Sequence, residues 1–398
     1  MEWWTHVLGW EVRRMNKVLL VDDKTISEEI LNIDPSEFQI VEKEEVIYDA
    51  KIEGEAISYI RDVWKRFKSS KVTVVATLTI ILIILLGIVG PYINDFTYIQ
   101  QDVDRAYLPP RIPRLEKIGI FDGTKVISIQ KRNLENYEDY IIKIVDEYEI
   151  KSRTGMVPML DIKIDAFKQK DAQDIYYWFG SDSLGRDMFT RLWMGTRVSL
   201  ILAFSVMLVN LSIGLVVGAV AGYYGGWIDI LIQRLLEIIT SIPQLPLTLL
   251  LIMWFGSGII PLIVVFVLTG WVGISNSVRI QFYRYKNMEY VLASRTMGAS
   301  DRRIMYKYIL PNAAGTIITN VALTLPFVIF QEAGLSYLGL GIQAPDPSIG
   351  QLLSDGQKVL LEYPYLLLFP GLIIILLMLS FNLLGNGLRD AFNPDLRQ

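Results

Sequence analysis

The residue types best suited to catalysis are scarce in this chain, which has no cysteine and a single histidine, His6. A lone histidine cannot build a multi-histidine metal site, and without cysteine there is no thiolate ligand, thiol nucleophile or disulfide. The sequence also has no phosphate-binding glycine loop, nucleophile elbow or zinc-protease motif. We therefore expect no catalytic residue, no metal site and no nucleotide bound by this chain itself.

The polar chemistry that remains is concentrated in residues 287–312, a polar segment between two apolar runs. Asn287 and Ser300 are placed to cap two short helices, because their side chains can accept from the unpaired N–H groups of an opening turn. Gly298 is placed to end the first helix in a left-handed conformation. This pattern predicts a helical pair that fits a groove on another molecule. The first helix would present a small, shallow surface formed by Ala293, Ser294 and Met297.

The runs that surround this polar segment predict a membrane protein. Apolar residues make up 52% of the chain, and a membrane span needs about 20 of them in succession. Pro243 and Pro246 interrupt the third run, where they would let the backbone bend and act as a gate. The six expected spans are Val72–Val89, Val198–Ala221, Ile228–Phe255, Ile259–Ile274, Ala313–Phe330 and Tyr365–Leu384.

Loop charge gives these spans an orientation. Basic residues precede the first span and fill the polar segment, which places both regions and both termini in the cytoplasm. Arg186, Arg191 and Arg197 disagree, but they follow a long loop, where the charge rule weakens. We therefore divide the chain into a cytoplasmic N-terminal segment (1–70), a first transmembrane helix (71–91), an external domain (92–180) and a core with five further spans (181–398).

The external domain has the composition of a folded segment. Lys117–Phe121 and Lys125–Gln130 alternate around Asp122-Gly123, which is typical of a hairpin turn. Tyr140–Val145 and Met159–Asp165 also have strand-like patterns. We expect a small, mostly β domain here. A disordered linker is the alternative, and the aromatic and β-branched content disfavours it.

The polar segment resembles the coupling loop of bacterial ABC importer permeases. The family pattern begins with Glu-Ala-Ala, which corresponds here to Leu292-Ala293-Ser294. Gly298 follows at the family spacing, and the closing Ile-x-Leu-Pro corresponds to Tyr308-Ile309-Leu310-Pro311. The departures at Leu292, Ser294 and Tyr308 are similar to those in the peptide-permease branch.

Four further stretches resemble the C-type subunit of the dipeptide/oligopeptide permease family. The resemblance covers about residues 57–398 apart from the external domain, which compact family members lack. Any one stretch would be weak evidence, but together they are specific. They are Phe179–Asp187, Gly222–Asp229, Glu332–Gly341 and Gly387–Asp395.

The resemblance implies an all-α integral membrane protein with six transmembrane helices of the type I ABC importer kind and a small, mostly β external domain inserted after the first span. It implies a pore subunit of an ATP-driven peptide importer in a bacterial cell membrane. The partners would be a second permease in a heterodimer, two ATP-binding cassette ATPases that bind the ATP, and an extracellular substrate-binding protein. Nucleic acid would not be a partner.

Roles for particular residues follow partly from their own chemistry and partly from the resemblance. Glu332, Pro243 and Pro246 are candidates for translocation or gating, because an ionisable group near the end of a span faces a cavity, a partner or water. The residues expected to couple to the ATPase are Glu289, Ala293, Ser294, Met297, Gly298, Asp301, Arg303, Leu310 and Pro311.

Three other functions compete with this one. A permease of the same superfamily could carry a metal chelate or an opine. A membrane receptor could bind a ligand with the external domain, but it would not need the polar segment. A stand-alone secondary transporter should show paired charges deep in several spans and inverted repeats, and the sequence shows neither.

Overall fold

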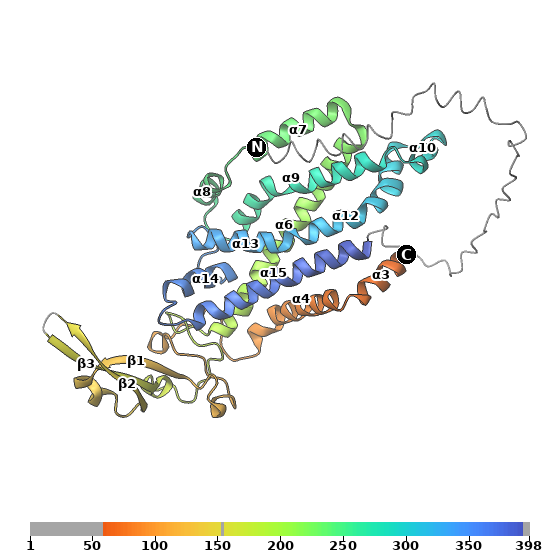
Figure 1. Cartoon of the computed structure of the whole chain (residues 1–398). Helices are drawn as coiled ribbons and strands as arrows, with labels where there is room; N and C mark the ends of the chain where they lie inside the picture. The colour runs from red at the N-terminus through yellow and green to blue at the C-terminus, as the bar shows by residue number, and fades with distance from the viewer. Residues whose placement is uncertain (1–58, 153–154, 393–398) are drawn as a thin grey trace, which may run out of the picture. The chain divides into compact units, whose positions relative to one another are not determined.

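A computed structural model describes residues 59–152 and 155–392, and most of the predicted N-terminal segment lies outside them. The described chain forms a bundle of helices with a three-stranded sheet at one end (Figure 1). The helices before and after the sheet are α3 (Tyr59–Ser69), α4 (Lys71–Val89), α5 (Ala166–Gln169), α6 (Met188–Tyr224), α7 (Gly226–Thr240), α8 (Gln244–Phe255), α9 (Ile259–Tyr285), α10 (Glu289–Thr296), α11 (Asp301–Arg303), α12 (Leu310–Ala322), α13 (Thr324–Tyr337), α14 (Ile349–Lys358) and α15 (Tyr365–Phe392).

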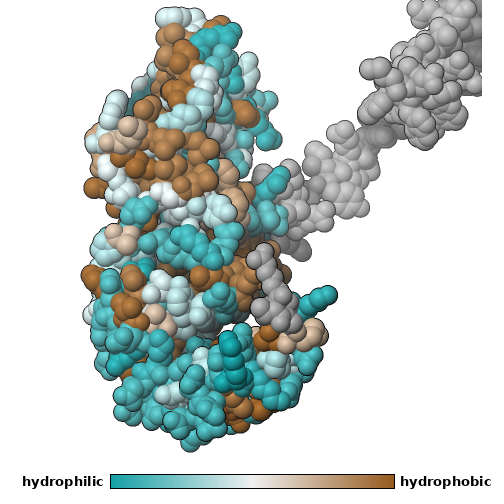
Figure 2. All heavy atoms as spheres, turned by 90° about the vertical axis from the view of Figure 1, so that its left-hand side faces the viewer, coloured by the Kyte–Doolittle hydropathy of each residue, from teal (hydrophilic) through white to brown (hydrophobic). Residues whose placement is uncertain are grey.

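The helices confirm the expected membrane architecture. Among the described residues, five helical stretches are long and apolar enough to cross a membrane, and α7 with α8 forms a sixth that is bent by 73°. Figure 2 shows hydrophobic side chains gathered over the helices and hydrophilic ones over the end that carries the sheet. The bend confirms the predicted break at Pro243, which is the N-cap residue of α8. Pro246 lies in the first turn of α8, where an N–H has no helical partner to lose.

Several spans are longer than the apolar runs predicted. The second begins at Met188 rather than Val198, because the arginines in its first three turns find partners inside the protein. Arg191 is fully buried and donates to the Tyr98 carbonyl, while Arg197 donates to the carbonyls of Gly87 and Ile88 at the end of α4. Polar side chains with such partners can continue a helix that hydropathy alone would end.

The sheet confirms the strands predicted after the first span at 125–130, 140–145 and 159–165 and corrects one hairpin. Its antiparallel order is β1 (Thr124–Gln130), β3 (Gly155–Asp165), β2 (Ile141–Ser152). The predicted strand Lys117–Phe121 is wrong: residues Glu116–Ile118 form a 3-10 turn, and β1 pairs with β3 instead. The sheet has its own core of Ile129, Leu160, Ile162 and Ile164.

Asp122 explains why no hairpin closes at this point. Its Oδ1 accepts from both the backbone N–H and the hydroxyl of Thr124, and its Oδ2 accepts from Lys163 Nζ at 2.9 Å. Burial opposes ionisation of Asp122, but the hydrogen bonds from Thr124 and Lys163 outweigh burial and lower its pKa. The turn at Asp122 therefore directs the chain into β1 beside β3.

Glycines let α6 and α9 pack with their backbones in contact. Gly214, Gly218 and Gly222 recur every four residues along α6, which places them on one face. A Cβ at Gly218 would lie 2.3 Å from the Ser275 carbonyl oxygen, and one at Gly222 would lie 2.5 Å from that of Arg279. Small residues at such spacing allow close helix contact within a membrane, where van der Waals packing drives association.

The close contact at Gly218 predicts that one added methyl group there lowers the stability of the protein. Gly218→Ala should destabilise the protein by about 1–3 kcal/mol, because the added carbon overlaps backbone that cannot yield cheaply. Thermal unfolding of the purified protein measures the effect. The matched control is Gly273→Ala on α9, where a Cβ meets nothing within 4 Å. Equal melting temperatures for the two variants would contradict the packing argument.

Candidate functional site

The polar segment forms α10, a tight glycine turn and the start of a long helix at the end of the bundle opposite the sheet, here called the α10 end (Figure 1). Gly298 has φ +82°, which confirms the predicted left-handed position. Its N–H donates to the Arg295 carbonyl, and the Ala299 N–H donates to the Ser294 carbonyl. This bonding pattern is a Schellman motif, so the glycine ends α10 and satisfies its last carbonyls.

The predicted cap at Asn287 is wrong, and the one at Ser300 is right in position but makes no capping bond. Met288, not Asn287, is the N-cap residue of α10, and Ser300 stands at the N-cap of α11 without a side-chain capping bond. The second helix is also not a separate short one. It passes through a π-helical turn, Ile304–Ile309, into α12. Pro311 follows this turn, and a widened turn is one way to fit a residue that lacks an N–H into a continuing helix.

The inner side of the polar segment is anchored by apolar packing. Val291, Ile304 and Ile309 are fully buried in a cluster with Tyr223 at the end of α6 and Phe282 at the end of α9. Burying a side chain of this size contributes about 1.5–3 kcal/mol. The segment is therefore fixed to the two helices that pack through glycine.

Polar contacts join the same elements. The Tyr223 hydroxyl donates to Asp301 Oδ1 at 2.6 Å and accepts from Arg295 Nη2 at 3.2 Å. Arg279 on α9 binds Asp229 on α7 through two bonds of 2.5 and 2.6 Å. Tyr223 and Asp229 were not predicted as site residues. Both lie in the Gly222–Asp229 stretch, and their partners Asp301 and Arg279 lie 78 and 50 residues away in the chain.

The outer side of the polar segment is exposed and mixes apolar with basic groups. Most predicted coupling residues lie there: Glu289, Ala293, Met297, Arg303 and Pro311 are exposed, and Leu310 is half-buried. Ser294 corrects the predicted surface, because it is buried and its hydroxyl donates to the Tyr290 carbonyl. Sequence reasoning missed Tyr306, which is 75% exposed and close in exposure to Met297 at 79%.

Glu332 lies buried among hydroxyls in the bundle. Its Oε1 accepts from Ser336 and Ser348, both at 2.7 Å, and its Oε2 accepts from Ser199 at 3.4 Å. Ser199 also accepts from the Ile349 N–H at the start of α14. No ion pair of Glu332 is found among the described residues. Its carboxylate thus joins α13, α6 and α14, and a role for it in translocation stays a prediction.

The predicted gate lies near the same helix. Gln244, next to Pro243 at the start of α8, accepts from the Gln331 amide at 3.4 Å. Gln331 directly precedes Glu332, so the break between α7 and α8 contacts the α13 turn that carries Glu332. The structure therefore brings the start of α8 next to the α13 turn that carries Glu332, although the two lie 87 residues apart in the chain.

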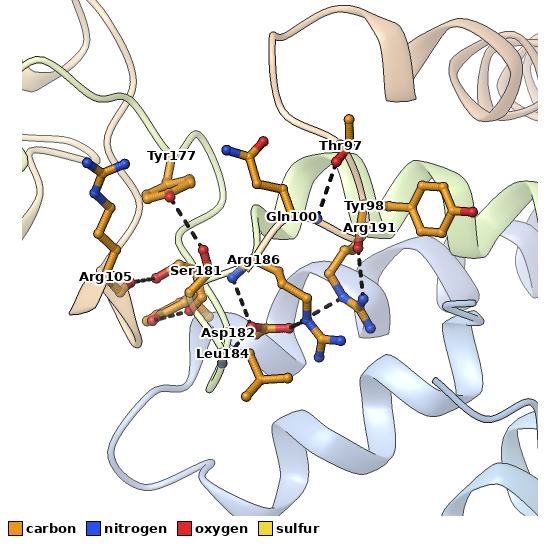
Figure 3. Close-up of polar contacts among 12 residues, drawn as sticks. Thr97, Tyr98, Gln100, Arg105, Tyr177, Ser181, Asp182, Leu184, Arg186 and Arg191 are labelled. Carbon is orange, nitrogen blue, oxygen red and sulfur yellow. Dashed lines mark hydrogen bonds and ion pairs between the residues drawn. The ribbon is translucent and has the colours of Figure 1, made fainter. Parts of the chain in front are cut away.

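A third polar cluster lies where the bundle meets the segment that carries the sheet (Figure 3). Asp182 Oδ2 pairs with Arg186 Nε at 2.7 Å and with Arg191 Nε at 3.4 Å. Its Oδ1 accepts from the backbone N–H groups of Leu184 and Arg186. Arg186 therefore pairs with Asp182, whereas Asp187 accepts from Thr190 and Asn94. Asp182 therefore joins two buried arginines, although Arg191 Nη2 and Asp187 Oδ1 have no hydrogen-bond partner among the described residues.

Comparisons with known proteins match nearly the whole described chain. Residues 214–398 match the family described as binding-protein-dependent transport system inner membrane component, and residues 58–110 match the N-terminal transmembrane domain of oligopeptide transport permease C. The dipeptide transport system permease protein of Bacillus subtilis (strain 168) is 33% identical over 92% of this chain and 94% of its own length. The oligopeptide transport system permease protein of the same organism is 34% identical over 87% and 93%.

A solved structure is also similar. The inward-facing MetNI methionine ABC transporter aligns with 52% of this chain and 98% of its own at 19% identity, with a TM-score of 0.42.

The Glu332 contacts generate a prediction about stability. Glu332→Ala should destabilise the protein by about 1–3 kcal/mol, because it leaves buried hydroxyl donors without an acceptor. Protease cleavage between α13 and α14 should also become faster. Glu332→Gln keeps an acceptor oxygen and should be milder, while Glu362→Ala, at an exposed position, is the control. A Glu332→Ala protein as stable and protease-resistant as the control would contradict this role.

Proposed function

This chain belongs to the peptide-permease family of binding-protein-dependent ABC importers, and we propose that it is one of two transmembrane subunits that form the pore of a peptide importer. The relatives that match over most of its length are named as dipeptide and oligopeptide permeases. The observation that carries the proposal within the structure is the polar segment. It is anchored on its inner side to α6 and α9 and exposed on its outer side.

The α10 end faces the cytoplasm in this proposal. Basic side chains are exposed along the polar segment, including Arg302, Arg303 and Lys307. Cytoplasmic loops of membrane proteins carry such an excess of lysine and arginine. The sheet then lies outside the cell, both termini lie in the cytoplasm, and the protein is a multi-pass component of a bacterial membrane.

The partners follow from the surfaces. The exposed side of the polar segment, with Met297 and Tyr306 among basic groups, suits docking on an ATPase subunit, because large apolar side chains ringed by charge are typical of interaction sites. A complete importer would contain two such ATPases, a second permease and an external substrate-binding protein. The ATPases bind the ATP, and this chain supplies no catalytic residue or cofactor of its own.

Motion would pass from the ATPase to the pore through packed contacts. A displacement of α10 pulls on Tyr223 and Phe282, which belong to α6 and α9. Because these two helices touch through glycine, they move together, and α6 reaches Glu332 through Ser199. Such tightly packed interfaces shift between discrete arrangements instead of bending continuously. Inward and outward access would be two of those arrangements.

Peptides are the substrate class that the relatives favour. Besides the two Bacillus permeases, a glutathione transport system permease protein of Pectobacterium atrosepticum is 37% identical over 56% of this chain and 73% of its own length. Dipeptides, oligopeptides and glutathione all carry peptide amides. This supports a peptide over a metal chelate or an opine. ATP-dependent uptake of labelled di- and tripeptides by proteoliposomes that hold the complete importer tests the proposal.

Coupling through the polar segment should fail when its glycine turn is changed. Gly298→Asp places a side chain at φ +82°, which costs about 1–2 kcal/mol of strain at the docking surface. Membrane insertion should survive while peptide uptake and peptide-stimulated ATP hydrolysis fall. The matched control is Gly119→Asp near the sheet, which has φ +79° and open space around it. Normal uptake by Gly298→Asp, or equal loss in both variants, would refute docking at this turn.

ATP hydrolysis should require the partner subunits. The purified chain alone should hydrolyse no ATP, since its sequence has no phosphate-binding loop. Phosphate release is the measurement, with mass spectrometry to verify that no other chain is present. Hydrolysis by such a preparation would overturn this assignment.

The sheet should assist delivery of substrate by the binding protein. Thr124 and Asp165 are paired residues at the open end of the sheet, so a two-residue Asn-Gly turn can replace everything between them. This excision removes the sheet core and leaves the separate cluster of Leu108, Phe167 and Tyr177 intact. Uptake should fall at low binding-protein concentration and recover at high concentration. Unchanged uptake across the whole range would assign the sheet no part in delivery.

A further inference from the structure

One face of the long helix formed by α12 and α13 is exposed or half-buried and uncharged, and five of its seven members are polar, the others being Phe327 and Gly334. Its residues follow helical spacing, with an average interval near the 3.6 residues of a helical turn. All are exposed or half-buried. We call this face the uncharged stripe, and its members are Asn312, Thr316, Asn320, Thr324, Phe327, Gln331 and Gly334.

From this placement we infer that the uncharged stripe lines the path of the peptide and hydrogen-bonds to its backbone amides. The inference deepens the proposed function and rests on it. The stripe extends from Asn312 to Gly334, which is about 33 Å at 1.5 Å per residue. The hydrocarbon core of a bilayer is about 30 Å thick. A substrate that follows the stripe would cross the full barrier.

Exposure to lipid would be costly for these groups. An amide or hydroxyl without a hydrogen-bond partner costs several kcal/mol in hydrocarbon. The α4 helix shows what a lipid-facing surface of this chain looks like. Its exposed side chains are mainly apolar and include Val75, Leu78, Leu82 and Leu85. The stripe departs from this pattern at Asn320 and Gln331, whose amides favour polar surroundings.

Neighbouring helices extend the polar character of the stripe. Asn320 donates to the Ser277 hydroxyl on α9, and Gln331 donates to Gln244 at the start of α8. These contacts leave carbonyl oxygens of both side chains able to accept further bonds, since an amide offers two donors and one acceptor oxygen. Four elements thus contribute to one polar surface.

The groups of the stripe match a peptide backbone. Amides and hydroxyls both donate and accept, so they can pair with the N–H and C=O of any residue regardless of its side chain. The stripe carries no charge that would hold one class of side chain tightly. Two glycines leave room beside it, because a Cβ at Gly334 or at Gly273 on α9 meets nothing within 4 Å. A chain can therefore approach closely at these points.

Thiol labelling tests the inference, and the absence of native cysteine makes every introduced thiol unique in this chain. Thr316→Cys, Asn320→Cys and Gln331→Cys are placed singly in the complete importer and treated with a membrane-impermeant thiol reagent. All three should react, and saturating trialanine should slow the reaction several-fold. Ile317→Cys on the buried face and Leu78→Cys on α4 are matched controls that should stay unreactive.

Two results would overturn the inference. Unreactive cysteines along the stripe would show that a partner subunit or lipid covers it. Reactive cysteines that trialanine leaves unprotected would show a water-filled face that peptide does not touch. Uptake by the unmodified importer is measured in the same proteoliposomes. If the unmodified importer takes up no peptide, the proposed function itself is wrong. If uptake is normal but trialanine does not protect the stripe, only the inference about the stripe is wrong.

A pair of substitutions at one site supplies a second readout. Asn320→Leu should raise the KM for trialanine several-fold, because it removes the amide, whereas Asn320→Gln should restore most of the affinity. Equal KM values for all three proteins would contradict a contact between Asn320 and the peptide backbone. Thermal unfolding of each variant separates this effect from a loss of fold.

Discussion

The close contact between α6 and α9 is the constraint on which the rest of the structure depends. Gly214, Gly218 and Gly222 bring the two backbones together, and Asn210 donates across the same interface to the Phe266 carbonyl. Within a bilayer there is no hydrophobic gain from joining two apolar helices, so packing and hydrogen bonds must hold them. A pair joined in this way behaves as one element when either helix is pushed.

The length of α6 lets this pair connect distant parts of the molecule. Its 37 residues extend about 55 Å. Tyr223 at one end holds Asp301 and Arg295, Ser199 reaches Glu332, and Asp187 caps the other end. Each contact is specific, because each joins a hydroxyl or carboxylate to a defined donor or acceptor. The exposed side of the polar segment and the α13 turn beside the predicted gate are thus attached to one helix.

The sequence predicted the parts of this structure that depend on local pattern. Apolar runs located the spans, and a glycine at the end of a helix located the turn at Gly298. The predictions were wrong where contacts between residues far apart in the chain determine the local structure. Arg191 can lie within α6 because it donates to the Tyr98 carbonyl and pairs with Asp182. Thr124 pairs with Asp165 instead of with the residues before it, because Asp122 turns the chain toward β3.

The predicted site shows the same division. Exposure of Met297 and Arg303 agrees with the helical spacing of the polar segment, whereas Ser294 is turned inward by packing against the bundle. The caps at Asn287 and Ser300 were predicted from residue type, but α10 and α11 both begin without a side-chain cap, and α10 is held by Val291 in the apolar cluster. Tyr223 could not be assigned, because its partner lies 78 residues later in the chain.

The central claim is that the exposed side of α10 docks on an ATPase, and cross-linking in the assembled importer tests it most directly. A photoreactive benzoylphenylalanine replaces Met297, and another replaces Tyr337 at the far end of α13, where the side chain is also exposed. Illumination at position 297 should join this chain to an ATPase subunit, and illumination at position 337 should not. An ATPase adduct formed from position 337 but not from position 297 would contradict the account.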